Sequence, residues 1–113
     1  MKIYIDGSGF NGNESKYCVL LENKEPIIIK FNENRTNNEM EYESLIHALK
    51  LANNKDHIFT DSRLLVGQVT MNWKINAKHL LKYVIEAKKI VKEKNINLYW
   101  IPREKNIAGH IFE

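Results

Sequence analysis

The sequence predicts an α/β protein in which a mixed five-stranded sheet is flanked by helices. Three short apolar runs lie before residue 32, and their short polar connections favour an antiparallel meander. The apolar residues then recur with helical spacing, and two further apolar runs follow, each after a helical segment. Strands linked through helices pair in parallel by right-handed crossovers. We therefore expect strands 1 to 3 to be antiparallel and strands 1, 4 and 5 to be parallel.

The first three strands are predicted by β-forming residues that are separated by turn-forming residues. The first lies within residues 2–9, where an apolar run ends in Asp6 and small residues follow at once. Residues 10–14 contain an Asn-Gly-Asn turn signature. The second and third strands are expected at residues 17–22 and 26–31, joined by a short polar connection.

The period of the apolar residues changes after residue 36. From Tyr42 they fall at i, i+3, i+4, i+7 and i+10, which is one face of a helix, and Thr36 is a candidate N-cap. Pro102 ends the last predicted strand. The expected elements of this part are a helix at 38–54, a strand at 57–60, a short helical turn at 62–69, a long helix at 77–91, a strand at 96–101 and a short helix at 104–113.

Length and composition predict one domain that spans residues 1–113. The hydrophobic fraction of 43% and the charged fraction of 27% are typical of a globular protein. Cys18 is the only cysteine and lies in an apolar run, so we expect a core thiol and no internal disulfide. No apolar stretch reaches about 18 residues and no signal peptide is visible. We therefore expect a cytoplasmic monomer that does not enter a membrane.

The formal net charge of +3 is too small to imply a polyanionic partner by itself. The distribution of the lysines is more informative, because many lie between residues 74 and 94. They could form a solvated helix face or a surface that binds phosphates. These residues are Lys74, Lys78, Lys82, Lys88, Lys89, Lys92 and Lys94.

Three acidic residues are expected to meet at one edge of the sheet. Asp6 and Asp61 each end an apolar strand, and the carboxyl ends of neighbouring parallel strands share one rim. Glu41 lies in the first turn of the first long helix, which can reach the same rim. Three converging carboxylates repel one another, and a divalent cation would relieve that repulsion. Each acid also has a simpler explanation, as a turn acceptor (Asp6), a helix N-terminal residue (Glu41) or an N-cap (Asp61).

Four motifs together resemble type 1 ribonuclease H, in the order of that family and with similar spacing. They are Ile-Asp-Gly-Ser at 5–8, Thr-Asn-Asn-Glu-Met-Glu at 36–41, Thr-Asp-Ser at 60–62 and Pro-Arg-Glu-Lys-Asn at 102–106. The sequence from Asp61 to Val69, followed by Asn-Trp-Lys, resembles the compact plant- and archaeal-like branch of this family. The resemblance covers essentially the whole chain and implies the RNase H-like fold.

The resemblance implies an endonuclease that hydrolyses the RNA strand of an RNA/DNA hybrid with two Mg²⁺ or Mn²⁺ ions. It makes Asp6, Glu41 and Asp61 catalytic metal ligands. Two ions roughly 3.5–4 Å apart would activate the water and stabilise the leaving oxygen. Trp73 either packs near the DNA strand or is a buried aromatic anchor. The implied substrate contacts, to ribose hydroxyls and phosphates, are Ser8, Asn11, Asn37, Asn38, Trp73, Lys74, Lys78 and Arg103.

The match fails at the fourth acid of the family, which is expected four residues after Asn106. That position is His110, which we expect to act as a catalytic metal ligand, with Glu113 as the alternative. Imidazole suits Mn²⁺ better than Mg²⁺, so a preference for manganese is predicted. The missing acid leaves open a catalytically silent module that binds nucleic acid. A third possibility is a DNA nuclease of the wider superfamily.

Overall fold

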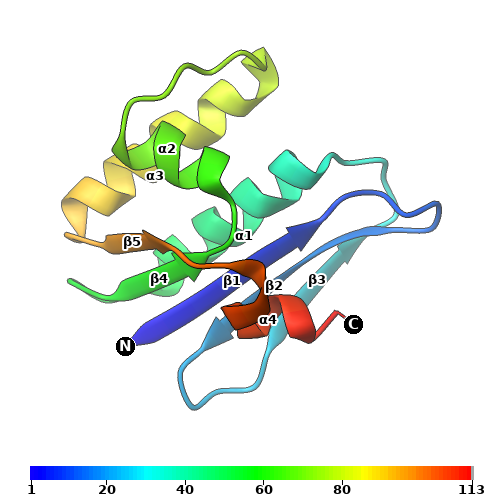
Figure 1. Cartoon of the computed structure of the whole chain (residues 1–113), viewed down its shortest axis with the longest axis horizontal. Helices are drawn as coiled ribbons and strands as arrows, with labels where there is room; N and C mark the ends of the chain where they lie inside the picture. The colour runs from blue at the N-terminus through cyan, green and yellow to red at the C-terminus, as the bar shows by residue number, and fades with distance from the viewer. Residues whose placement is uncertain (113) are drawn as a thin grey trace.

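The computed structural model describes residues 1–112, and Figure 1 shows one sheet with helices on its faces. The strands are β1 (Lys2–Ser8), β2 (Ser15–Leu21), β3 (Ile27–Phe31), β4 (His57–Thr60) and β5 (Asn97–Trp100). The helices are α1 (Asn37–Leu51), α2 (Arg63–Thr70), α3 (Leu81–Glu93) and α4 (Ile107–His110), with 3-10 turns at Lys78–Leu80 and Arg103–Lys105.

The sheet has the strand order β3-β2-β1-β4-β5, which confirms the mixed topology that the sequence predicts. The β1 strand pairs antiparallel with β2 and parallel with β4, and β4 pairs parallel with β5. Ile3 and Ile5 are fully buried, whereas Tyr4, which alternates with them, stays partly exposed and stacks on Phe59. Asp6 shares the side of β1 that carries Tyr4, because side chains alternate along a strand.

The start of α1 is fixed beside β1 by a cap and by a close backbone approach. Thr36 and Glu39 form a reciprocal capping box. A Cβ atom added to Gly7 would overlap the backbone at Met40 and Glu41, so only glycine lets the helix lie this close to the strand. This packing brings Glu41 to the strand that carries Asp6. The buried side of α1 then extends the core along the sheet through Met40, Leu45, Ala48 and Leu49.

The last segment differs from the expected helix at 104–113. A 3-10 turn ends at Lys105, and Asn106 adopts an extended conformation (φ −86°, ψ 96°) before the single turn of α4. Asn106 is the N-cap of α4, and its fully buried side-chain amide donates to the Ile5 carbonyl at 2.8 Å. Glu113 lies outside the described residues. None of the helices in residues 1–112 has the length and apolar character needed to cross a membrane.

Candidate metal centre

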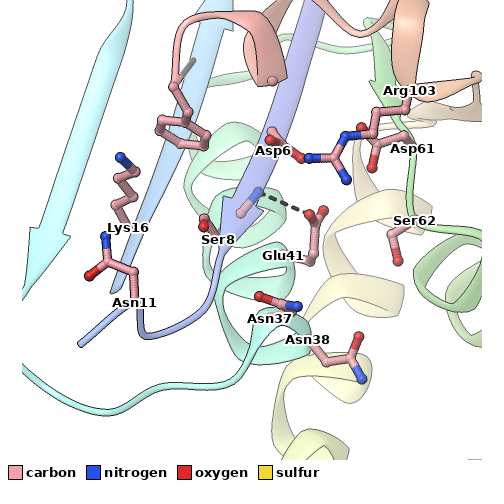
Figure 2. Close-up of a pocket in the computed structure, with 13 residues that line it drawn as sticks. Asp6, Ser8, Asn11, Lys16, Asn37, Asn38, Glu41, Asp61, Ser62 and Arg103 are labelled. Atoms are coloured by element: carbon pink, nitrogen blue, oxygen red, sulfur yellow. Dashed lines mark hydrogen bonds between the residues drawn. The ribbon is translucent and has the colours of Figure 1, made fainter. Parts of the chain in front are cut away.

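Three carboxylates converge where β1, β4 and the start of α1 meet. Asp6 belongs to β1, Glu41 to α1, and Asp61 directly follows β4. One carboxylate oxygen from each residue lies within 4.8 Å of the others. Figure 2 shows the three side chains pointing into the same cavity, with Arg103 beside Asp6 and Asp61. The structure therefore brings together the three acids that the sequence analysis singled out.

The simpler roles of two of these acids are filled by their neighbours. Glu39, and not Glu41, completes the capping box of α1. Ser62, and not Asp61, caps α2, since its hydroxyl accepts a hydrogen bond from the Leu65 N–H at 3.2 Å. Helix capping thus does not explain why Glu41 and Asp61 point toward Asp6.

Glu41 is the most enclosed of the three carboxylates, with 7% of the residue exposed. Its Oε1 accepts a hydrogen bond from the Gly7 N–H at 3.0 Å, and its Oε2 accepts one from the Thr60 hydroxyl at 3.5 Å. These contacts come from β1 and β4, so they hold the side chain between the two strands that carry the aspartates. Burial, followed by the Asp6 charge, raises the pKa of Glu41 well above its usual range.

The charges of the cluster are costly without a cation. Burial, followed by the Asp61 charge, raises the pKa of Asp6 to about 6, while the Arg103 charge partly opposes this shift. Within residues 1–112, none of the three acids forms an ion pair with a lysine or arginine. Mg²⁺ and Mn²⁺ prefer hard oxygen ligands. The donor set therefore fits a divalent cation of this kind.

Asn106 orients one of the acids, a role that motif matching did not reveal. Its side-chain amide donates to Asp61 Oδ2 at 3.0 Å as well as to the Ile5 carbonyl, which lies next to Asp6 in β1. Its Oδ1 accepts from the Ala108 N–H at 3.3 Å and so begins α4. One buried amide thus links β1, the end of β4 and the last helix. The position of Asn106 in the fourth motif was the only signal of this role in the sequence.

The acids lie in a cavity of about 510 Å³ that contains most of the predicted substrate contacts. Asn37 is held there by the Gly9 N–H, which donates to its Oδ1 at 2.5 Å. The predicted residues Trp73, Lys74 and Lys78 are exposed elsewhere and do not line the cavity. The lining comprises Asp6, Gly7, Ser8, Asn11, Lys16, Asn37, Asn38, Glu41, Asp61, Ser62, Arg103, Gly109 and Phe112. Of these, Gly7, Lys16, Ser62, Gly109 and Phe112 were not predicted as site residues.

His110 does not join the acidic cluster in this structure. Its ring is exposed, and Nε2 lies 3.1 Å from the Glu104 carbonyl oxygen. Gly109 takes the position that faces the aspartates, since an added Cβ there would lie 3.1 Å from Asp6 Oδ2 and 4.0 Å from Asp61 Oδ2. Asn106 is the extended N-cap of α4, and Gly109 is the residue of this short helix that lies against the two aspartates. A ligand role for His110 stays a prediction that this geometry does not favour.

The fold and the three-acid cluster define an α/β protein with a site suited to divalent cations. The family model described as RNase H matches residues 1–110, and the chain therefore belongs to the RNase H family.

Two curated relatives and one solved structure place the chain among known proteins. Over 76 residues, or 63% of this chain, it is 36% identical to the bifunctional protein Rv2228c of Mycobacterium tuberculosis and 34% identical to a ribonuclease H of Caldicellulosiruptor saccharolyticus. These matches cover 21% and 52% of the two relatives, so the chain spans about a fifth and about half of their lengths. The crystal structure of LC11-RNase H1 in complex with RNA/DNA hybrid is 29% identical, with a TM-score of 0.76, over 93% of this chain and 87% of that one.

Proposed function

We propose that this chain is an endonuclease that hydrolyses the RNA strand of RNA/DNA hybrids with two Mg²⁺ or Mn²⁺ ions. The observation that carries the proposal is the convergence of Asp6, Glu41 and Asp61 in a member of the RNase H family. The hybrid bound to LC11-RNase H1 supports the choice of substrate. We further propose that residues 1–113 act as one domain, as a monomer and in the cytoplasm.

The three carboxylates would hold the ions, which supply an activated water and charge stabilisation at the leaving oxygen. Glu41 is fixed by hydrogen bonds from two strands, and Asp61 is fixed by Asn106, so little reorganisation is needed when a cation binds. The guanidinium of Arg103, at the edge of the cavity, can contact a substrate phosphate.

Asn37 is the residue best placed to recognise a ribose. Its Oδ1 is occupied by the Gly9 N–H, which leaves the Nδ2 group to donate into the cavity. A ribose 2′-hydroxyl can accept this hydrogen bond, and DNA has no such group. Ser8, Asn11 and Asn38 line the same cavity and extend this polar surface.

Gly109 favours a second candidate function, a module that binds hybrids and cleaves them weakly or not at all. A glycine facing Asp6 supplies no fourth carboxylate, so one side of the site would depend on water for ligands. Three carboxylates accept Mg²⁺ and Mn²⁺ alike, whereas a strong preference for Mn²⁺ would indicate an imidazole ligand such as His110.

The experiment that tests the proposal compares the cleavage of four matched substrates, with each strand labelled in turn. We expect the RNA strand of the RNA/DNA hybrid to be cut, and the DNA duplex, RNA duplex and single-stranded RNA to remain intact. Glu41→Gln should lower the rate at least about a hundredfold, and the exposed Glu25→Gln should leave it unchanged. Cleavage of the DNA duplex would support a DNA nuclease instead. Hybrid binding without cleavage would support the silent module.

A further inference from the structure

A second surface carries both tryptophans of the chain. Trp73 and Trp100 line one pocket of about 260 Å³ together with Arg63, Val66 and Met71, and we call these five residues the tryptophan patch. Met71, Trp73 and Trp100 are 57%, 45% and 38% exposed. Large apolar side chains that gather at one exposed place indicate a binding surface more often than single exposed residues do. The proposed nuclease site uses no residue of this patch except Trp73, which lies outside the acidic cavity.

The rings of the patch are held in place by the fold. Trp100 lies at the end of β5, and its indole N–H donates to the Asp61 carbonyl at 3.1 Å. Trp73 lies against α2, where a Cβ atom on Gly67 would overlap the indole. The Trp73 backbone N–H also donates to the Gly67 carbonyl at 3.0 Å. Rings that are fixed before binding lose little conformational entropy when a ligand stacks on them.

The charge of the patch is positive. The guanidinium of Arg63 lies 4.2 Å from the centre of the Trp100 ring, which is a cation–π arrangement. Arg63 is the only charged residue in the lining, and the exposed Lys74 follows Trp73 in the chain. An aromatic surface with an arginine and no carboxylate is suited to bases and phosphates.

The patch adjoins the acidic cavity through the chain itself. Asp61 supplies a carboxylate to the cavity and a backbone carbonyl to Trp100, and Arg63 follows two residues later. The two sites share no lining residue, but Ser62 of the cavity and Arg63 of the patch are neighbours in the chain.

We propose that the tryptophan patch binds unpaired nucleotides, with bases stacked on Trp100 and Trp73 and a phosphate held by Arg63. Stacking on an indole tolerates every base, so the patch would bind single strands with little sequence preference. The positive charge and the continuity with the acidic cavity favour nucleic acid over a protein partner. This activity goes beyond hybrid cleavage, since it needs neither metal ions nor a duplex.

The test measures the binding of a fluorescein-labelled twelve-nucleotide oligothymidylate by anisotropy, in EDTA and at low salt. The intrinsic fluorescence of the protein gives a second readout, because both tryptophans belong to the patch. We expect saturable binding with quenching of this fluorescence. Trp100→Ala should weaken binding at least about fivefold, and Trp100→Phe, which keeps a ring, should restore most of the affinity.

The contributions of the Arg63 charge and of its planar guanidinium group can be tested separately. Arg63→Ala should weaken binding by a similar factor, and Arg63→Lys should recover only part of it, because lysine keeps the charge but not the planar stacking. The control Lys92→Ala removes an exposed charge outside the patch and should change binding less than twofold. The assay contains neither metal ions nor a hybrid, so its result is separate from the fate of the nuclease proposal.

Three outcomes would overturn the proposal. The first is the absence of binding at millimolar oligonucleotide. The second is equal weakening by Lys92→Ala and Arg63→Ala, which would indicate general attraction to a basic protein. The third is a dimer that forms without oligonucleotide and is lost in Met71→Lys, which would assign the patch to self-association. Circular dichroism establishes whether each variant is folded. If Trp100→Ala does not fold, the binding of the oligonucleotide by Arg63→Ala tests the proposal.

Discussion

Replacing Asp6 by asparagine should stabilise the protein in the absence of metal ions at neutral pH. The side chains have nearly the same shape, but asparagine carries no charge. In the metal-free protein the Asp6 carboxylate is partly buried and is repelled by Asp61. The substitution removes that cost and also relieves Glu41, whose pKa is raised in part by the Asp6 charge.

The size of the effect follows from the raised pKa of Asp6. Folding raises the pKa of the Asp6 carboxyl from 3.8 to about 6. At about 1.4 kcal/mol per pKa unit, this shift lowers the free energy of unfolding by up to about 3 kcal/mol when the pH is above both pKa values. Between these pH values the folded protein binds more protons than the unfolded chain, so stability falls as the pH rises. Solvent screens part of this cost, and we expect Asp6→Asn to gain about 1–3 kcal/mol at pH 7.5. The gain should shrink to about 1 kcal/mol or less at pH 4.5.

Urea unfolding in EDTA, followed by circular dichroism at the two pH values, measures this difference. The control Glu25→Gln removes an exposed carboxylate from the β2–β3 connection and should change stability by less than about 0.5 kcal/mol. Adding Mn²⁺ should stabilise the parent protein more than Asp6→Asn. The reasoning would be refuted if Asp6→Asn were less stable than the parent at pH 7.5 in EDTA, or if its gain were the same at both pH values.

Three further substitutions test the contacts that build the site. Gly7→Ala would overlap the backbone at Met40 and Glu41 and should lower the free energy of unfolding by at least about 2 kcal/mol in urea titrations; a loss below about 0.5 kcal/mol would contradict the close approach. Asn106→Asp replaces the buried amide donor with an acceptor beside Asp61 and should cost about 2–4 kcal/mol at pH 7.5, and equal stability would show that the amide does not orient Asp61. Gly109→Asp adds a carboxylate beside Asp6 and should tighten Mn²⁺ binding at least about tenfold by calorimetry. Gly109→Ala is its control, and the same Mn²⁺ affinity in both variants would contradict the inference that residue 109 faces the acidic cluster.

The order and pairing of the strands could be predicted because local signals agreed with the topology. Alternating β-forming residues lead into Asp6, and helical periodicity begins near Tyr42. Asp61 follows the next parallel strand, and parallel strands place their ends at the same rim. The convergence of the three acids could therefore be predicted from the sequence alone. The prediction that Cys18 is buried in the core is also confirmed.

The geometry of the last motif could not be predicted from the sequence, because Asn106 interrupts the helix expected there. The spacing of the family motif, counted from Asn106, selects His110, but in the structure Asn106 is extended and its side-chain amide donates to the Ile5 carbonyl. Gly109 then faces the acids. Long-range contacts of this kind decide conformation without leaving a local pattern. The tryptophan patch was missed for the same reason, since Arg63 and Trp100 meet only through the packing of α2 beside β5.

The central claim is that Asp6, Glu41 and Asp61 form one metal-dependent catalytic site. The most direct measurement titrates Mn²⁺ into the metal-free protein and records, at each concentration, both calorimetric binding and cleavage of the RNA strand of a hybrid. We predict no cleavage in EDTA, a rate that rises over the concentrations at which Mn²⁺ binds, and the loss of both binding and cleavage in Asp61→Asn. Cleavage that persists in EDTA, or that Asp61→Asn leaves unchanged, would contradict the account.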